Sequence, residues 1–321
     1  VASLARNYFY VRIWAAPATL SLYVFKGWFI GMQNTVSPMA VDITVNVVNL
    51  VASWVLALYT PLGMVGVALG TVIAQYTGLA LASGLFLRYY RKLLRYFSWR
   101  RDVRLRDMRR YFVLNGNLFL RSLCMLAVYT GFTALSARFG DTLLAVGSIV
   151  MKLLMFYSYF LDGFAYAGEA LAGKYIGANN RPALQQMVRQ LFIWGIGLAL
   201  ASTLIYGIGG ETFLGLITNE QNVIASSSTY FYWVLAIPLA GFAAFLYDGI
   251  FIGATATNLM LRAMAIASAA FFGIYFGCRE ALGNHALWLA FITYLLLRGI
   301  IQGYYYHCHS ERSEESRKHP H

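Results

Sequence analysis

Charged residues are scarce in this sequence of 321 residues. Only 12% of the chain is Asp, Glu, Lys or Arg, about half of the ~25% found in soluble domains, whereas 59% is hydrophobic and the mean hydropathy is +0.58. This balance excludes a water-soluble globule. In a hydrocarbon solvent only helices and closed barrels satisfy their backbone groups. The apolar runs are about 20 residues long and lack the alternation of barrel strands, so we predict an all-α integral membrane protein.

Motifs that carry catalysis or bind metals are also missing from the sequence. The three cysteines, Cys124, Cys278 and Cys308, are odd in number and have no metal-ligand spacing, so we interpret them as small buried hydrophobes. The histidines lie near the ends of the last apolar run or beyond it. Motifs for hydrolysis or phosphate binding are absent as well. We therefore expect a protein that is not an enzyme and has no resident cofactor or metal.

Nine apolar windows are long enough to span a bilayer, and residues such as Pro61 and Gly140 punctuate the gaps between them. The windows are about 9–31, 40–60, 63–87, 112–136, 143–173, 188–209, 224–252, 261–279 and 285–306. None of the gaps is long enough to hold a soluble domain.

The net charge of +12 comes from the connections between the windows. Ten of the 25 Lys and Arg residues lie within 88–110, which the positive-inside rule predicts to be a cytoplasmic loop. Alternate connections then carry Lys174, Arg181 and Arg262, whereas the stretch 211–220 on the opposite side is acidic. This pattern predicts a cytoplasmic C-terminus and a bilayer, not a nucleic acid, as the partner of the basic residues.

An internal repeat links the first and seventh windows. Pro17 followed by KGWFIG at 26–31 recurs as Pro238 followed by DGIFIG at 248–253. Windows six apart run in the same direction, so the repeat is parallel about an axis along the membrane normal, as in transporters that rock two halves against each other. Two halves of six spans would require three more spans before Val1.

The predicted organisation follows from this repeat. We expect 1–90 to be the second half of an N-lobe, 88–110 the basic cytoplasmic loop between lobes, 111–306 a C-lobe of six spans, and 307–321 a polar disordered cytoplasmic tail.

Ionisable side chains inside the apolar windows are the first candidates for function, because a charge at membrane depth is costly without a partner or a cavity. Asp248 lies deep in the seventh window near Pro238, where a carboxylate can exchange a proton or hold a cation. The alternative is a structural salt bridge with Lys152 or Arg121. Arg298 is another charge within a window.

A second acid, Asp162, is also a candidate for cation or proton coupling. Glu169 follows it by seven residues, on the same helical face and nearer the cytoplasmic end. Lys26 occupies the position that corresponds to Asp248 in the repeat. The predicted gate or lobe-interface residues are Glu169, Lys26, Lys152 and Arg121.

Uncharged polar residues in the second and third windows form a possible oxygen-rich cluster. Asn46, Asn49 and Ser53 lie in one window and Thr71 in the next. We predict that Asn49, Thr71 and Ser53 contribute to coupling, the alternative being hydrogen bonds that hold helices together. Glycine pairs at four-residue spacing, including those at 27/31, 66/70 and 249/253, predict close approach of neighbouring helices.

Several segments resemble the multidrug and toxic compound extrusion (MATE) family, particularly its bacterial DinF-like branch. They include GVALGTVIAQ at 66–75, DGFAYAGEALAGKYIGA at 162–178 and DGIFIGAT from Asp248, and the resemblance extends over nearly all of residues 8–306. Such proteins are twelve-span bundles of two six-helix lobes that expel cationic or amphipathic compounds in exchange for H+ or Na+. The resemblance therefore implies a two-lobe bundle with about nine spans present and the first three missing.

The resemblance also implies an N-lobe cation site, which this sequence matches in part. Asn49 and Thr71 correspond to the family's Asn and Thr, but Ser53 stands where the family has an acid. We therefore expect Asp248 and Asp162 in the C-lobe to take a larger share of coupling.

The function predicted from the resemblance is cation-coupled efflux by alternating access. We expect a monomer in the inner (cytoplasmic) membrane that acts on small amphipathic or cationic substrates. Two alternatives remain. One is a lipid-linked oligosaccharide flippase of the same superfamily, which several Lys or Arg in one cavity would favour. The other is a truncated membrane scaffold without transport.

Overall fold

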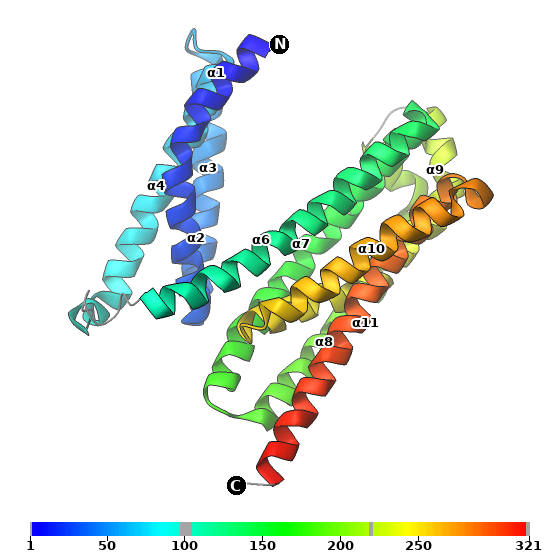
Figure 1. Ribbon diagram of the computed structural model, residues 1–321. Coiled ribbons are helices and arrows are strands. Elements are labelled where there is room, and N and C mark those ends of the chain that lie inside the picture. Colours follow the sequence, from blue (N-terminus) through cyan, green and yellow to red (C-terminus); the bar gives the residue numbers. More distant parts are fainter. Residues whose placement is uncertain (1, 97–104, 218–220, 319–321) are drawn as a thin grey trace. The chain divides into compact units, whose positions relative to one another are not determined.

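The computed structural model describes residues 2–96, 105–217 and 221–318, and over these ranges the chain is helical with short turns and no strand (Figure 1). The predicted all-α fold is therefore confirmed. The chain divides into two compact units, Val1–Arg104 and Leu105–His321, with the boundary inside the predicted basic loop. Residues 97–104 of that loop and 218–220 of the predicted acidic stretch lie outside the described ranges.

The described residues of the first unit form four α-helices with short 3-10 segments. These elements are α1 (Ala2–Arg12), η1 (Ile13–Ala15), α2 (Ala16–Gly31), α3 (Val36–Leu58), α4 (Met64–Tyr90) and η2 (Arg91–Tyr96). Helix α4 packs against α1, α2 and α3, and its contact with α3 is the most extensive. A small core of Leu22, Phe29, Val41 and Ala82 lies among these helices.

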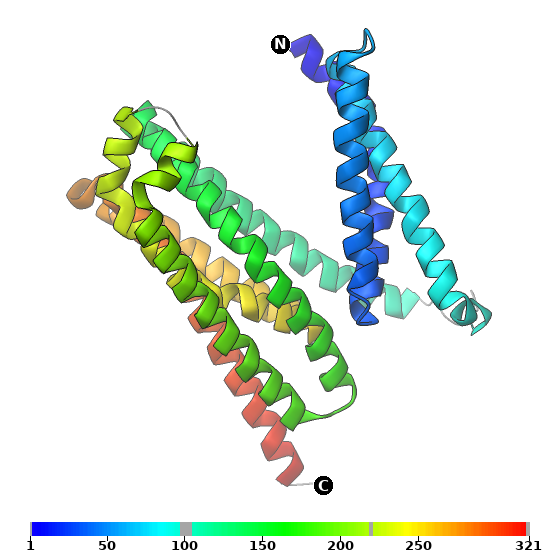
Figure 2. The same cartoon turned by 180° about the vertical axis from the view of Figure 1, so that it is seen from behind.

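The described residues of the second unit form six long helices. Figures 1 and 2 show this bundle from opposite sides. The helices are α6 (Leu105–Ser136), α7 (Asp141–Gly177), α8 (Arg181–Ile217), α9 (Gln221–Gly253), α10 (Thr257–Leu282) and α11 (Asn284–Lys318), with the 3-10 turn η3 (Ala137–Phe139) before α7. Helix α9 packs against α7, α8 and α11, and α10 packs against α6 and α11. Aromatic residues from α6 and α11 fill much of the core, including Phe132, whose ring centroid lies 5.0 Å from that of Trp288.

Eight helices of the described ranges are long and apolar enough to cross a membrane, and they coincide with eight of the nine predicted windows. The exception is the window 9–31, which runs through α1, η1 and α2. The 3-10 turn at Ile13–Ala15 interrupts the path just before Pro17, which has no amide hydrogen to continue the ladder of helical hydrogen bonds. Helix α2 alone is 16 residues long.

The C-terminal tail differs from the disordered segment that we expected at 307–321. Helix α11 continues to Lys318, and residues 319–321 lie outside the described range. The sequence SERSEESRK at 310–318 contains Glu, Arg and Lys, which favour helix, and no Gly or Pro before Pro320. Low hydrophobicity therefore predicted disorder where helix propensity and continuity with a long helix prevail.

The repeat found in the sequence recurs in the backbone. At the end of α2, the Asn34 amide donates to the carbonyl of Phe29, and at the end of α9 the Ala256 amide donates to the carbonyl of Phe251, each at 2.9 Å. The residue before each donor has positive φ, 59° and 55°. Both turns thus have the hydrogen bond of a Schellman motif. The accepting phenylalanine occupies the same position in each repeat segment, KGWFIG at 26–31 and DGIFIG at 248–253.

A third copy of this turn closes α7. The Asn180 amide donates to the carbonyl of Tyr175 at 2.9 Å, and Asn179 has φ of 53°. The side chain of Asn180 then accepts from the amide of Ala183 at 3.2 Å and caps α8. The sequence comparison missed this copy because only the short segment YIG at 175–177 resembles FIG.

Glycines bring α9 into direct contact with α7. A Cβ at Gly249 would overlap the backbone carbonyl of Ala165, and one at Gly253 would overlap that of Glu169. No side chain fits at either position unless the helices separate. The close approach predicted for this glycine pair is confirmed, and it brings the backbones of α7 and α9 together beside Asp248.

The other glycine pairs divide between contact and open space. A Cβ at Gly70 of α4 would lie 2.5 Å from the amide nitrogen of Ser53 in α3, and Gly66 is similarly enclosed. At Gly27 and Gly31 a Cβ would meet no described atom within 4 Å. The repeat therefore preserves the glycines of α2 without the packing role that they have in α9.

Candidate functional site

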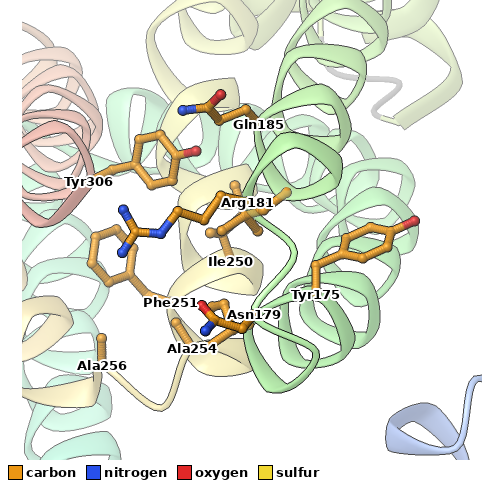
Figure 3. Close-up of a pocket in the computed structure, with 11 residues that line it drawn as sticks. Tyr175, Asn179, Arg181, Gln185, Ile250, Phe251, Ala254, Ala256 and Tyr306 are labelled. Atoms are coloured by element: carbon orange, nitrogen blue, oxygen red, sulfur yellow. The ribbon is translucent and has the colours of Figure 1, made fainter. Parts of the chain in front are cut away.

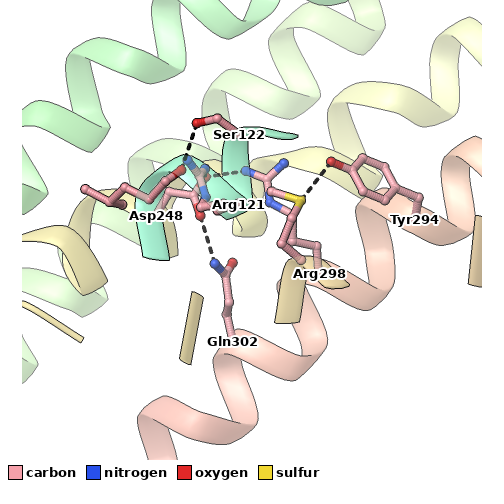
Figure 4. Close-up of polar contacts among 8 residues, drawn as sticks. Arg121, Ser122, Asp248, Tyr294, Arg298 and Gln302 are labelled. Carbon is pink, nitrogen blue, oxygen red and sulfur yellow. Dashed lines mark hydrogen bonds and ion pairs between the residues drawn. The ribbon is translucent and has the colours of Figure 1, made fainter. Parts of the chain in front are cut away.

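Asp248 lies at the centre of a polar cluster inside the second unit (Figure 4). Its Oδ2 accepts from the Nη2 atoms of Arg121 in α6 and Arg298 in α11. Its Oδ1 accepts from Nε2 of Gln302 at 2.8 Å. The cluster thus joins three helices through a single carboxylate, and each helix belongs to a candidate membrane span.

This cluster is deeply buried. Asp248 is 8% exposed, Arg298 1% and Gln302 0%. The guanidinium of Arg298 also lies 5.2 Å from the ring centroid of Phe245, within cation–π range. Two guanidinium groups around one carboxylate leave one positive charge unbalanced among these residues. An uncompensated charge at membrane depth is costly, so the cluster has an electrostatic reason to hold a further anion.

Several polar atoms of the cluster have no hydrogen-bond partner among the described residues. They are Nε of Arg121, Nε and Nη1 of Arg298 and Oε1 of Gln302. Tyr294, one turn before Arg298, donates its hydroxyl hydrogen to Sδ of Met264 at 3.1 Å. The cluster therefore retains N–H groups that can donate hydrogen bonds to water or to an anion.

The cluster bears directly on the salt-bridge interpretation of Asp248. Of the two partners considered from the sequence, Arg121 contacts Asp248, whereas Lys152 is exposed on α7 and is not part of the cluster. Sequence reasoning did not connect Arg298 and Gln302 with Asp248. The signal was present, because these two residues stand four apart in an apolar window and so share one helical face.

The other C-lobe acids lie on α7. Asp162 is half-buried, and its negative charge interacts with that of Asp248 across space. The described residues provide Asp162 with no hydrogen bond or ion pair in addition. Glu169 is also half-buried, and its carbonyl lies against Gly253 where α7 and α9 touch. Of these two acids, Asp162 is thus the one whose charge interacts with that of Asp248, whereas Glu169 lies two turns further along α7.

The predicted oxygen-rich cluster forms in the first unit. Nδ2 of Asn49 donates to Oγ1 of Thr71 at 3.1 Å, and Oγ of Ser53 lies 3.5 Å from Oδ1 of Asn49. Arg12 also donates to Thr71 at 3.4 Å. Asn46 bonds instead to a carbonyl of its own helix. The cluster therefore contains neutral oxygens and one guanidinium, with no carboxylate among these hydrogen-bonded side chains.

Lys26 forms an ion pair with Asp42, and both side chains are partly exposed. Of the cations considered for a flippase cavity, Lys26 is paired with Asp42, Arg121 and Arg298 are both paired with Asp248, and Lys152 is exposed. The two pockets described for the second unit are lined by none of them. This arrangement gives no support to the flippase alternative.

Comparison with solved structures identifies the class of fold. The bent form of a MATE transporter from Vibrio cholerae, VcmN, superimposes with a TM-score of 0.82 over 94% of this chain and 68% of its own, at 17% sequence identity. The two-lobe bundle expected from the sequence is thus the fold of solved MATE transporters. At this identity the likeness concerns the fold alone.

Sequence comparison identifies the family. The family model MatE matches residues 118–277. The chain is 34% identical over 305 residues to DNA damage-inducible protein F of Escherichia coli K12, covering 92% of this chain and 64% of that protein. It is 25% identical over 300 residues to Protein DETOXIFICATION 43 of Arabidopsis thaliana, covering 93% of this chain and 56% of that one. The chain belongs to the MATE family and spans less than two thirds of these relatives.

Proposed function

We propose that the protein containing this chain is a secondary active exporter of amphipathic or cationic organic compounds. It works as a monomer in the cytoplasmic membrane, with a cytoplasmic C-terminus and two lobes that alternate in access. Membership of the MATE family supports this proposal, and one relative, from Danio rerio, is named Multidrug and toxin extrusion protein 1.

The single observation that carries the proposal is the buried carboxylate of Asp248, held by two arginines within membrane-spanning helices. Ionisable residues at membrane depth are rare and are retained where they serve transport. A carboxylate shared by three helices links their positions to one charge. A change in that charge therefore alters the contacts of α6, α9 and α11 together.

We assign the exchangeable proton to Asp162. When Asp162 is ionised, its negative charge balances the excess positive charge of Asp248, Arg121 and Arg298. When Asp162 is protonated, the group as a whole is positive and repels a cationic compound. Proton binding and cation binding then oppose each other, which is the requirement for antiport of the two.

This arrangement favours H+ over Na+ as the coupling ion in the C-lobe. A Na+ ion at Asp248 would lie beside the guanidinium groups of Arg121 and Arg298, which repel it. A proton needs only one carboxylate with room to accept it. The neutral cluster of Asn49, Ser53 and Thr71 contributes to coupling in our proposal only together with a carboxylate from outside the cluster.

The test is substrate-triggered proton and Na+ flux in liposomes, with ethidium as the cationic compound. We expect Asp162→Asn to lose most ethidium-dependent proton flux, and Asp248→Asn to lose it as well because the arginines are then unbalanced. Asp141→Asn is the matched control, because it removes the same charge from a residue that is exposed at the start of α7. Wild-type proton flux in Asp162→Asn would exclude Asp162 as the coupling residue. Flux that follows a Na+ gradient instead would overturn the assignment of H+.

A further inference from the structure

Two adjoining pockets lie at one end of the second unit, where α7 meets α8 and α9 meets α10. Their volumes are about 280 and 320 Å³. Both are lined by Gln185 of α8 and Tyr306 of α11, so they form one continuous surface, which we call the α8–α11 groove. Ile250 and Phe251 of α9 line the first pocket, and Tyr247 of α9 lines the second.

One wall of the groove is cationic. Arg181, Gln185 and Arg189 follow each other at four-residue intervals and so lie along one face of α8. Eight residues of helix separate the two arginines by about 12 Å along the axis. Figure 3 shows the Arg181 side chain reaching toward Tyr306 and Phe251, with Gln185 further along α8. Among the residues with described side chains, those that line the two pockets include these two arginines and no Asp or Glu.

The floor of the groove is apolar and closely packed. Ile250 and Phe251 are buried, and the ring centroid of Tyr247 lies 4.8 Å from that of Phe192 and 6.0 Å from that of Tyr306. The groove therefore combines fixed positive charges with a packed hydrocarbon and aromatic surface. A free inorganic anion would use only the first of these features.

The position of the groove along the helices matches the edge of a bilayer. Helix α7 ends at Gly177, α8 begins at Arg181 and α9 ends at Gly253, and all three belong to candidate membrane spans. The matching turns after α7 and α9 contribute Asn179 and Ala256 to the rim. Side chains at such helix ends lie in the headgroup region, and basic pockets between helices there bind anionic lipid headgroups.

We propose that the α8–α11 groove binds an anionic phospholipid. The phosphate lies along Arg181, Gln185 and Arg189, and an acyl chain lies over Ile250 and Phe251. The charge of the wall is complementary to a phosphodiester and repels the cationic compounds assigned above as substrates. The site therefore takes a membrane lipid as ligand, and it does not depend on the transport activity.

The experiment measures lipid bound to the purified protein by native mass spectrometry. Phosphatidylglycerol is compared with phosphatidylcholine of the same acyl chains, for the wild type and the Arg181→Gln/Arg189→Gln variant. With about a fivefold effect for each arginine, we expect the wild type to prefer phosphatidylglycerol about 30-fold and the double variant to lose the preference. Arg189 is exposed, so Arg189→Gln alone should reduce the preference about fivefold without disturbing packing.

Arg262→Gln is the matched control, because Arg262 lies near the start of α10, is exposed, and lines neither pocket. It should retain the wild-type preference. An equal loss of the phosphatidylglycerol preference in this control would show that the preference depends on general surface charge, and it would overturn the proposed site. A preference that persists in both Arg189→Gln and the double variant would do the same. Displacement of phosphatidylglycerol by millimolar inorganic phosphate would identify a free-anion site and overturn the assignment to lipid.

Discussion

Replacement of Asp248 by Asn tests whether the buried carboxylate stabilises the second unit. Asp248→Asn keeps the shape of the side chain but removes the carboxylate with which both Arg121 and Arg298 form ion pairs. Removing one partner of a buried ion pair costs about 3–5 kcal/mol, because the remaining charge stays buried. For a unit of this size, each kcal/mol lowers the melting temperature by about 2–4 °C. We therefore expect a decrease of about 6–20 °C.

The companion variant Arg298→Gln has a different electrostatic result. It keeps the ion pair between Arg121 and Asp248, so the loss is that of a charged hydrogen bond, about 1.5–3 kcal/mol. In Asp248→Asn/Arg298→Gln, one guanidinium instead of two loses its ion pair with Asp248. We therefore expect this double variant to melt no lower than Asp248→Asn alone, which is a strongly non-additive result.

The assay is thermal unfolding in detergent, followed with a thiol-reactive fluorophore. Cys124 and Cys278 of the second unit are free thiols that the fold partly buries. Unfolding therefore increases their reaction with the dye. Asp141→Asn serves as the control and should melt within about 1 °C of the wild type, since surface substitutions have small effects. Additive losses in the double variant would refute the reasoning, as would an effect of Asp248→Asn no larger than that of Arg298→Gln.

Two further predictions concern packing and the exposed ion pair. Gly249→Ala should destabilise the second unit by about 1–3 kcal/mol because its Cβ overlaps the carbonyl of Ala165, whereas Gly273→Ala, in open space on α10, should be neutral or stabilising by up to about 1 kcal/mol. Equal melting temperatures for these two alanine variants would contradict the proposed contact between α7 and α9. Lys26→Gln should change stability by less than about 1 kcal/mol, because its pair with Asp42 is partly exposed. A loss as large as that of Asp248→Asn would show that exposure does not weaken this pair.

Local sequence was sufficient for much of the fold. Apolar length predicted eight of the spans, and the Pro and Gly repeat linked the segments in which the structure shows matching turns after α2 and α9. It did not predict the break at Ile13–Ala15, because hydropathy averages over a window and does not register a single missing amide at Pro17.

The candidate site was predictable only in part. Asp248 and Arg121 were identified because a charged side chain at membrane depth is unfavourable without a partner, and Asn49, Ser53 and Thr71 were identified as one cluster. The sequence left Lys152 and Arg121 as equal partners for Asp248, because which helices meet is decided by packing between segments far apart in the chain.

The sequence by itself determined that this chain occupies a bilayer, where eight of its spans lie and which family it belongs to, because length, hydropathy and short motifs are local properties. Only the tertiary structure decided that Arg298 and Gln302 join Asp248, that Gly249 rather than Gly27 meets a neighbouring backbone, and that two arginines of α8 line a groove with Tyr306. These features depend on the rotation of each helix about its axis. That rotation is fixed by the close packing of α9 against its neighbours, to which residues far apart in the sequence contribute.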